Sequence, residues 1–272
     1  MTLQGKTVLI TGSTDGVGRR VAEKLAQQGA TILVHGRDQA RAESLLATIR
    51  NAGGSGTFYP ADLSSLIEVR ALAEAVQRDH DRLDILINNA GIGVGGSGSG
   101  RQVSRDGHEL RFVVNYLSSF LLTRLLLPVL KASRPARIVN VASVGQQPID
   151  FTDVMLMHGY SGRRAYCQSK LAQIMFTFDL SKELEGAGIT VNSLHPATYM
   201  DTAMVRGDGI SPTSSVDEGA DAILYLAASG AMAGKTGLYL DGQRPSRANA
   251  QAYDVTARER LRFLSLELVG LS

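Results

Sequence analysis

The sequence predicts an α/β fold, a doubly wound parallel sheet of about seven strands with helices on both faces. Short apolar runs alternate along the chain with segments whose apolar residues recur at helical spacing. A glycine-rich turn joins the first apolar run to the first helical segment, as in sheets that bind nucleotides. No boundary or internal repeat interrupts the alternation, so residues 1–272 are expected to form a single domain.

The expected strands are short runs rich in apolar and β-branched residues. They cover 8–10, 31–34, 57–59, 83–87, 137–142, 190–195 and 238–240. The first expected helix follows the glycine turn and ends at Gly29, and the others cover 39–51, 64–80 with Ser64 as N-cap, 106–130, 162–184, 216–228 and 250–268. Segments 144–161 and 197–215 are expected to be loops beside a substrate, and 250–272 a C-terminal helical tail.

The composition is that of a soluble globular protein, with 44% hydrophobic and 20% charged residues. A net charge of +2 gives no reason to expect nucleic acid or an anionic membrane as a partner. The single cysteine, Cys167, cannot form an internal disulfide and supplies no metal cluster, which fits a reducing cytoplasm. The N-terminus lacks a signal-peptide pattern. The apolar stretch 120–130 contains Arg124 and Pro128 and is shorter than the roughly 20 residues of a membrane span, so a core helix is expected.

Residues 11–18 have the sequence Thr-Gly-Ser-Thr-Asp-Gly-Val-Gly and are predicted to bind phosphate. Glycine has no Cβ, so the backbone can turn sharply and a pyrophosphate can approach the positive end of the helix. The spacing differs from the commoner dinucleotide fingerprint Gly-x-Gly-x-x-Gly, and a plain tight connector is the alternative. The predicted cofactor contacts in this turn are Gly12, Ser13, Thr14, Asp15, Gly16, Val17 and Gly18.

The end of the second expected strand indicates which dinucleotide is bound. An NAD site needs a carboxylate here to accept from the ribose 2′-hydroxyl, and Gly36 occupies that position. Arg37 offers a fork of donors suited to a 2′-phosphate, so NADP is preferred and NAD is the alternative. Asp38 would serve as the ribose carboxylate if the register shifted by one residue, and Asp15 adds negative charge nearby. A solvated loop arginine is the other interpretation of Arg37.

Tyr166 and Lys170 lie four residues apart in an expected helix, so both side chains are on one face. An ammonium beside a phenol favours the phenolate, which would lower the pKa of Tyr166 from its reference value of about 10. Such a phenol can exchange a proton with a substrate. The same spacing also occurs on ordinary amphipathic helices, so the pair needs support from the rest of the chain.

Five features occur in order on the expected elements. They are Thr11-Gly12-x-x-x-Gly16-x-Gly18, Asn88-Asn89-Ala90-Gly91, Asn115, Ser143 and Tyr166-x-x-x-Lys170. This combination resembles the short-chain dehydrogenase/reductase family, from Gly5 to about Leu240. The resemblance implies a Rossmann-type sheet and an oxidoreductase that uses a nicotinamide cofactor.

The resemblance also implies a role for each catalytic residue. Tyr166 would be the general acid/base, Lys170 would lower its pKa and hold the nicotinamide ribose, and Ser143 would bind the substrate oxygen. Asn115 would hold a water molecule in a proton relay to Lys170. Asp62 ends the third expected strand, where its carboxylate can accept from an adenine amino group. The further cofactor contacts are Arg37, Asp62, Leu63, Asn89, Ala90, Gly91, Tyr166, Lys170, Pro196 and Thr198.

The long gap between Ser143 and Tyr166, Arg37 and the segment 115–123 resemble the retinol-dehydrogenase-like branch, which includes relatives of protochlorophyllide reductase. That branch favours NADP. Its membrane-bound members carry an N-terminal anchor that this chain lacks, so a soluble protein is expected. The family further implies a homo-oligomer, a dimer or tetramer in which two long helices pair across an axis.

The loop after the sixth expected strand departs from the family pattern. The family has Pro-Gly here and a threonine a few residues later, whereas this chain has Pro196-Ala197 followed by Thr198 and Thr202. Either threonine can therefore meet the nicotinamide carboxamide. We prefer the backbone around Ala197 and Thr198.

The predicted function is reversible hydride transfer between NADP(H) and a carbonyl or secondary alcohol, without a metal. Cys167 and His195 are expected to be structural, with Cys167 on a different helix face from Tyr166. A catalytically silent NAD(P)-binding sensor or scaffold of the same fold is the alternative from another class. A nucleotide-sugar epimerase or dehydratase would need a larger C-terminal domain.

The substrate is expected to be fairly apolar, because bulky apolar side chains occur in the two loops that would wall the pocket. These are Phe151, Met155, Met157, Tyr160, Tyr199, Met200 and Met204. The same residues would equally pack the loops onto the sheet. The glycine-rich segment 91–100 is expected to be a mobile lip on the site, or a plain connector.

Overall fold

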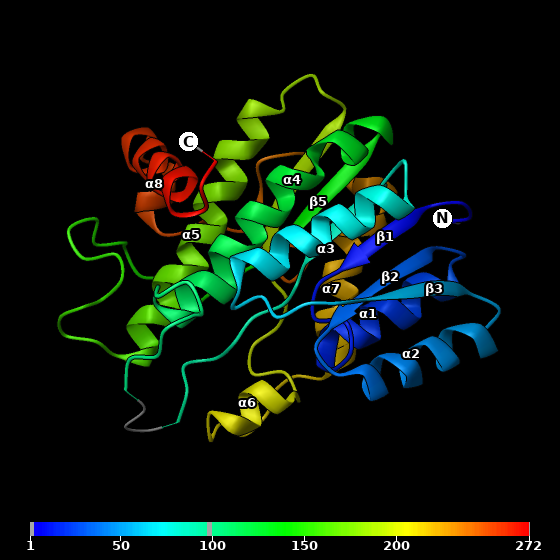
Figure 1. The fold of residues 1–272 in the computed structure, drawn as a ribbon, viewed down its shortest axis with the longest axis horizontal. Coiled ribbons are helices and arrows are strands. Elements are labelled where there is room, and N and C mark those ends of the chain that lie inside the picture. Colours follow the sequence, from blue (N-terminus) through cyan, green and yellow to red (C-terminus); the bar gives the residue numbers. More distant parts are fainter. Residues whose placement is uncertain (1–2, 97–99, 272) are drawn as a thin grey trace.

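The computed structural model describes residues 3–96 and 100–271, which form one eight-stranded sheet with helices on both faces (Figure 1). The strand order is β3-β2-β1-β4-β5-β6-β7-β8. The strands are β1 (Thr7–Ile10), β2 (Thr31–Gly36), β3 (Ser55–Pro60), β4 (Ile85–Asn88), β5 (Ala136–Val141), β6 (Ile189–His195), β7 (Tyr239–Asp241) and β8 (Arg244–Pro245). The first seven are parallel, and the two-residue β8 pairs antiparallel with β7. The predicted α/β doubly wound fold is therefore confirmed, with β8 as an unpredicted addition.

The described residues form eight α-helices, most of which follow a strand. They are α1 (Gly16–Gln27), α2 (Gln39–Asn51), α3 (Leu66–Asp79), α4 (Ser118–Ala132), α5 (Gly162–Glu183), α6 (Ala203–Gly207), α7 (Val216–Ala228) and α8 (Val255–Leu268). Figure 1 shows α1, α2 and α7 on one face of the sheet and α3, α4 and α5 on the other, and each set encloses its own apolar core. The strand order reverses between β1 and β4, so their carboxyl ends open a crevice, where ligands bind in such sheets.

The helix predicted from residue 106 begins later and contains a different kind of turn. Helical structure starts at Leu110, because Gly107 adopts a φ of +81°, which ends a tight turn before the helix. A π-helix, η1 (Phe112–Leu117), then precedes α4 and contains Asn115. Such wide turns occur mostly as short interruptions of α-helices, often at functional sites.

Two other boundaries differ because a cap overrides the apolar pattern. The N-cap of α3 is Ser65 rather than Ser64, and its hydroxyl accepts from the backbone N–H of Glu68 at 3.4 Å. The C-terminal tail is not one helix. A 3₁₀ turn, η3 (Ala250–Tyr253), comes first, and Asp254 then caps α8.

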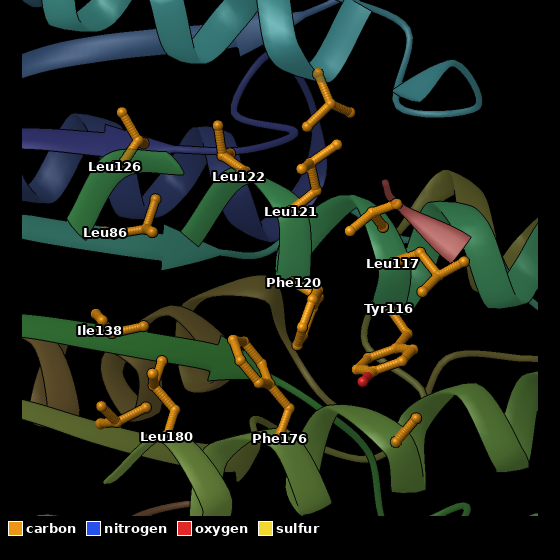
Figure 2. Packing of buried hydrophobic residues seen from close by; sticks show 14 of the residues in the cluster. Leu86, Tyr116, Leu117, Phe120, Leu121, Leu122, Leu126, Ile138, Phe176 and Leu180 are labelled. Carbon is orange, nitrogen blue, oxygen red and sulfur yellow. The ribbon is translucent and has the colours of Figure 1, made fainter. Parts of the chain in front are cut away.

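The core between α4, α5 and β5 is rich in aromatic rings (Figure 2). Phe120 of α4 and Phe176 of α5 lie with ring centroids 5.0 Å apart, and Tyr116 of η1 lies 6.0 Å from Phe120. All three are buried, with Ile138 of β5 close by. This packing fixes α5, which carries Tyr166 and Lys170, over the end of β5.

Within the described residues, one helical run is long and apolar enough to cross a membrane. It is Phe112–Ala132, which joins η1 to α4 and has a mean hydropathy of 1.6. Arg124 and Pro128 do not interrupt it, so the run is longer than the sequence suggested. Because 72% of its most apolar window is buried against the rest of the protein, it serves as a core helix, as expected.

α8 packs against α5 of the same chain (Figure 1). Arg262 of α8 pairs with Asp179 of α5 at 3.3 Å, and the ring of Tyr253 lies 5.3 Å from that of Phe178. A dimer in which α5 pairs across an axis would therefore have to share this face with α8. In this structure α8 therefore occupies part of the α5 surface that the expected helix pairing between subunits would use.

Candidate active site

One cavity of about 1520 Å³ lies at the carboxyl ends of the strands. Pockets for single small molecules are commonly about 300–1,000 Å³, so this cavity has room for a dinucleotide and a substrate together. The predicted site residues that line it are Gly12, Thr14, Asp15, Gly16, Val17, Gly18, Arg37, Asp62, Leu63, Asn89, Ala90, Gly91, Ser143, Tyr166, Lys170, Pro196 and Thr198. Ser13 and Asn115 are the predicted site residues that do not line it.

The conformation of the glycine turn requires residues without a Cβ atom. Gly12 and Gly16 adopt positive φ values of +64° and +53°, which glycine takes without strain. A Cβ on Gly18 would lie 2.3 Å from the Gly12 carbonyl oxygen and 2.4 Å from Nδ2 of Asn89. Asp15 caps α1 by accepting from the Gly16 N–H at 2.7 Å. The turn thus keeps the start of α1 close to the strand ends.

Ser13 does not line the cavity, and its role as a cofactor contact stays a prediction. Its backbone N–H donates to the His35 carbonyl oxygen at 2.9 Å, and its hydroxyl accepts from the His35 N–H at 3.0 Å. The His35 ring also holds the turn, because Nδ1 accepts from the Gly12 N–H at 3.0 Å. Burial lowers the pKa of His35 to about 4, so the ring stays neutral. Ser13 therefore fastens the turn to β2.

The Asn88–Gly91 segment supports the turn from the other side. The Asn89 side chain donates to the carbonyl oxygens of Thr11 at 2.8 Å and Gly12 at 3.2 Å. The Thr11 hydroxyl in turn accepts from the backbone N–H groups of Asn89 and Ala90. These bonds join the ends of β1 and β4.

The residues from which the sequence predicted the cofactor preference lie at the end of the cavity next to β2. A Cβ on Gly36 would lie 2.6 Å from the Thr14 side chain, so a carboxylate at this position has no room. Asp38 is occupied as the N-cap of α2, where it accepts from the Arg41 N–H at 3.0 Å. Arg41 also lines the cavity and pairs with Asp15 at 2.7 Å. The negative charge of Asp15 is thus balanced by the Arg41 guanidinium. Arg41 was not predicted, although one turn of helix separates it from Asp38.

The catalytic end gathers Ser143, Tyr166 and Lys170 at one wall of the cavity. The Lys170 ammonium lies 5.9 Å from the centroid of the Tyr166 ring. Burial raises the pKa of Tyr166, while a hydrogen bond from Ser143 acts to lower it. The net shift of the Tyr166 pKa is therefore upward, because burial of the phenol dominates. Burial also lowers the pKa of Lys170 to about 7, which weakens its charge at neutral pH.

Ser143 is held from three directions. Its hydroxyl accepts from the Gly145 N–H at 3.0 Å. Its carbonyl oxygen accepts from the Gln146 side chain at 3.0 Å and from the hydroxyl of Tyr239 in β7 at 3.1 Å. The Tyr239 contact was not predicted, since 96 residues separate the two. The serine is thus rigidly placed at the end of β5.

Asn115 is fully buried and uses its side chain to fix a neighbouring loop. Its Oδ1 accepts from the Ile92 N–H at 2.8 Å, and its Nδ2 donates to the Ser169 hydroxyl at 2.9 Å. A Cβ on Gly91 would lie 3.2 Å from this Oδ1 and 3.4 Å from Nζ of Lys170. The structure therefore brings Asn115 and Lys170 together around Gly91, although Asn115 does not reach the cavity.

The apolar part of the cavity is built partly from unexpected residues. Of the seven bulky residues named from the sequence, Tyr199, Met200 and Met204 line it, and Phe151, Met155, Met157 and Tyr160 do not. Phe151 and Met155 pack against the core instead, so for them the loop-packing interpretation is right. The other apolar lining residues on this side are Val103, Leu110, Val114, Val144, Ala203, Val205 and Ile210.

Cys167 and His195 also line the cavity. Although Cys167 follows Tyr166 directly in α5, the two side chains approach the same glycine, since a Cβ on Gly145 would lie 3.5 Å from the Cys167 sulfur and 3.6 Å from the Tyr166 ring. Burial raises the pKa of the Cys167 thiol, which keeps it protonated and agrees with a packing role. His195 bonds to the Thr198 hydroxyl at 3.0 Å, and burial lowers its pKa.

The two candidate threonines lie at different places in the cavity. Thr198 follows β6 and bonds to its His195. Thr202 caps α6, which lies within the predicted loop 197–215, and its methyl group lies 3.4 Å from a Cβ built on Gly16. Thr198 therefore sits at the end of β6, and Thr202 at the glycine turn.

The rim next to the apolar part is held by Asp208, which the sequence analysis missed. Its carboxylate accepts from the N–H groups of Val94 at 3.1 Å and Gly95 at 2.9 Å. The buried Arg111 donates to the carbonyl oxygens of Gly93 and Val94, each at 2.8 Å. Residues 93–95 are thus fixed on both sides. Residues 97–99 of the predicted mobile lip lie outside the described residues.

Comparison with known proteins assigns the family. A family model described as short chain dehydrogenase matches residues 6–210. Retinol dehydrogenase 13 of Mus musculus is 37% identical, with 100% of this chain and 86% of the relative covered, and retinol dehydrogenase 12 of Homo sapiens is 36% identical over 99% of this chain and 88% of the relative. A solved structure of an uncharacterized protein from Mycobacterium paratuberculosis has a TM-score of 0.79 and 27% identity, covering 99% and 95% of the two chains. The Pseudomonas aeruginosa RhlG/NADP active-site complex has a TM-score of 0.73 and 30% identity, covering 88% and 95%.

The fold and the cavity define an oxidoreductase that uses a nicotinamide cofactor and acts on alcohol or carbonyl groups. The chain belongs to the short-chain dehydrogenase family. Within that family it lies in the retinol-dehydrogenase-like branch. The predicted family and branch are both confirmed.

Proposed function

We propose that the protein interconverts a fairly apolar carbonyl compound and its secondary alcohol, with NADP(H) as cofactor and Tyr166 as the general acid/base. The observation that carries the proposal is the convergence of Ser143, Tyr166 and Lys170 on the wall of the same cavity that contains the glycine turn. The residues present fit a dinucleotide. Gly16, Val17 and Gly18 at the start of α1 line the cavity, and the absence of a Cβ at Gly18 lets the turn pack closely against Asn89. The start of a helix favours a phosphate group.

A bound nicotinamide supplies or accepts the hydride, and the protein's own residues handle the proton. In reduction, the Tyr166 hydroxyl donates its proton to the developing oxyanion, while Ser143 donates a hydrogen bond to the same oxygen. Lys170 holds the nicotinamide ribose by its ammonium. Asn115 would order a water molecule near Lys170, and their proximity around Gly91 supports this role.

The substrate class is tested with NADPH oxidation against a homologous series of methyl ketones and a matched set of small polar carbonyls. Because each buried methylene contributes about 0.8 kcal/mol, kcat/KM is expected to rise roughly fourfold per methylene until the apolar part of the cavity is filled. A preference for small polar carbonyls would contradict the apolar pocket. Absence of turnover with every carbonyl would favour the catalytically silent sensor.

The preference for NADP is tested with Arg37→Ala. An arginine bonded to a 2′-phosphate contributes about 1.5–3 kcal/mol, so the ratio of kcat/KM for NADPH to that for NADH is expected to fall by about 10- to 100-fold. Arg50→Ala, at the far end of α2 and outside the cavity, is the matched control and should leave the ratio unchanged. A ratio unaffected by Arg37→Ala excludes the arginine contact.

We further propose that the protein works in the cytoplasm as a homo-oligomer, following the sequence and the family. Because α8 already covers part of α5, a dimer would use another face or extend around α8. Light scattering of the purified chain measures the state directly, and a monomeric mass would overturn this part of the proposal.

A further inference from the structure

The ammonium of Lys170 has two buried acceptors. Nζ donates to the Val141 carbonyl oxygen at 2.9 Å and to Oε1 of Gln173 at 2.9 Å. The lysine is only 4% exposed, and in the described part of the chain it forms no ion pair. Two neutral oxygen atoms therefore hold a buried cation that has no carboxylate beside it. The third N–H of the ammonium remains for the cavity.

The Gln173 carboxamide is arranged for the lysine and not for its own hydrogen bonding. Gln173 is fully buried in α5, and among the described residues its Nε2 has no hydrogen-bond partner. Rotating the amide by 180° would bring that donor against the ammonium. A buried donor without a partner costs about 1–3 kcal/mol, so an apolar residue of the same shape would suit the core better. The oxygen at Lys170 is the one contact that accounts for a glutamine here.

A chain of hydrogen bonds ties the backbone of Gln173 to the strands. The Thr177 hydroxyl donates to the Gln173 carbonyl oxygen at 2.8 Å, and Asn140 of β5 donates to that hydroxyl at 2.8 Å. Asn88 of β4 donates in turn to the Asn140 side chain at 2.8 Å. Since Val141 follows Asn140 in β5, both acceptors of the ammonium belong to one rigid unit.

We propose that Gln173 is a positioning residue that fixes the Lys170 ammonium and keeps it charged while Tyr166 exchanges its proton. The inference rests on the proposed role of Tyr166. The side chain acts through its oxygen atom, which stabilises the charged form of the lysine. Without that acceptor, the lysine loses its proton more readily, and Tyr166 loses the positive charge that favours its phenolate.

The other groups around the pair do not replace Gln173. His195 of β6 lies near Lys170 and is kept neutral by burial. Asp208 acts on Tyr166 in the opposite sense, since its negative charge favours the protonated phenol. Arg163 also lines the cavity, and its charge acts on Cys167. Lys170 is the cation whose ammonium lies 5.9 Å from the centroid of the Tyr166 ring.

The test is Gln173→Met, which keeps the unbranched shape and removes the acceptor. Relative to the wild type, kcat for alcohol oxidation at pH 7 is expected to fall about 10- to 100-fold, the range for a hydrogen bond to a charged group. The midpoint of the rise of kcat with pH is expected to move upward by about one pH unit, because the phenolate is harder to form. At pH 9, where the folded Lys170 is largely neutral, the midpoint of thermal unfolding should stay the same or rise, because an unpaired donor is removed. A merely structural glutamine would shift the unfolding midpoint and leave the pH profile in place.

Gln173→Glu and Gln168→Met complete the experiment. Glutamate keeps an oxygen at the same place, so its kcat is expected to exceed that of the methionine variant. Gln168 is equally buried in α5 but bonds to Val154, so Gln168→Met should leave the pH midpoint unchanged. A folded Gln173→Met protein with the wild-type kcat and pH midpoint overturns the inference, as does a glutamate variant no better than methionine. Loss of folding in both Gln173→Met and Gln173→Leu would also overturn it, because the role would then be structural.

The Tyr166→Phe and Gln173→Met variants distinguish a failure of the inference about Gln173 from a failure of the proposed function. If Tyr166→Phe keeps wild-type turnover, the acid/base role itself is wrong. If Tyr166→Phe is inactive while Gln173→Met behaves as wild type, only the role of Gln173 is wrong.

Discussion

Tyr166→Phe is expected to lower kcat for NADPH-dependent carbonyl reduction by about 10²- to 10⁴-fold, the range that general acid catalysis contributes. The substitution removes the proton donor and leaves the aromatic ring in place at the cavity wall. Binding of NADPH, followed by its fluorescence, should change by less than about threefold, because the glycine turn and the adenosine end are untouched. The loss should therefore appear in kcat and hardly in cofactor affinity.

The pH dependence of the wild type provides a second readout for the same residue. Burial raises the pKa of Tyr166, so the phenol is protonated at neutral pH and ready to donate in the reduction direction. The rate of carbonyl reduction should stay constant through neutral pH and fall at higher pH, where the phenol ionises. The rate of alcohol oxidation should rise over the same range of high pH. Tyr225→Phe, in α7 and outside the cavity, is the control for loss of a hydroxyl. Substantial turnover by Tyr166→Phe would remove the residue from the mechanism.

The order of elements was predictable because it depends on local patterns. Apolar runs and helical spacing locate seven strands and their helices, and α2 and α7 match the predicted bounds throughout. The glycine turn was also predictable from the sequence, because the steric constraints at Gly12 and Gly18 show as a local glycine pattern. Boundaries failed where a single side chain decides, as when Ser65 caps α3 in place of Ser64.

The supports of the site were not predictable, because they join residues far apart in the chain. Asp208 reaches the N–H of Gly95 across 113 residues, and Tyr239 reaches Ser143 across 96. Neither residue carries a local signal, since an aspartate after a short helix or a tyrosine in a strand is ordinary. The net direction of the pKa shift of Tyr166 was not predictable for a related reason. Spacing shows that Lys170 shares its face, whereas burial, which decides the sign, depends on the whole fold.

Lys170→Met is expected to inactivate the protein and to stabilise it. Burial lowers the pKa of Lys170 to about 7, far below the value of about 10.4 in an unfolded chain. At pH 6 the folded protein therefore carries a buried cation, and replacing it with an apolar side chain should raise the free energy of unfolding by about 1–4 kcal/mol. The same change should lower kcat by about 10²- to 10³-fold, since the ribose and the Tyr166 phenolate lose their positive partner.

The sign of the pH dependence makes this prediction specific. Between the folded pKa of about 7 and the unfolded value, the unfolded chain binds one proton more, so wild-type stability gains from Lys170 as pH rises through that window. The advantage of the methionine variant should thus be largest below pH 7 and shrink by pH 9, as measured by chemical denaturation at both values. Lys182→Met, at the exposed end of the same helix, should show no such trend. If Lys170→Met is less stable than the wild type at pH 6, the contacts with Val141 and Gln173 outweigh burial, and the lysine is a structural as well as a functional residue.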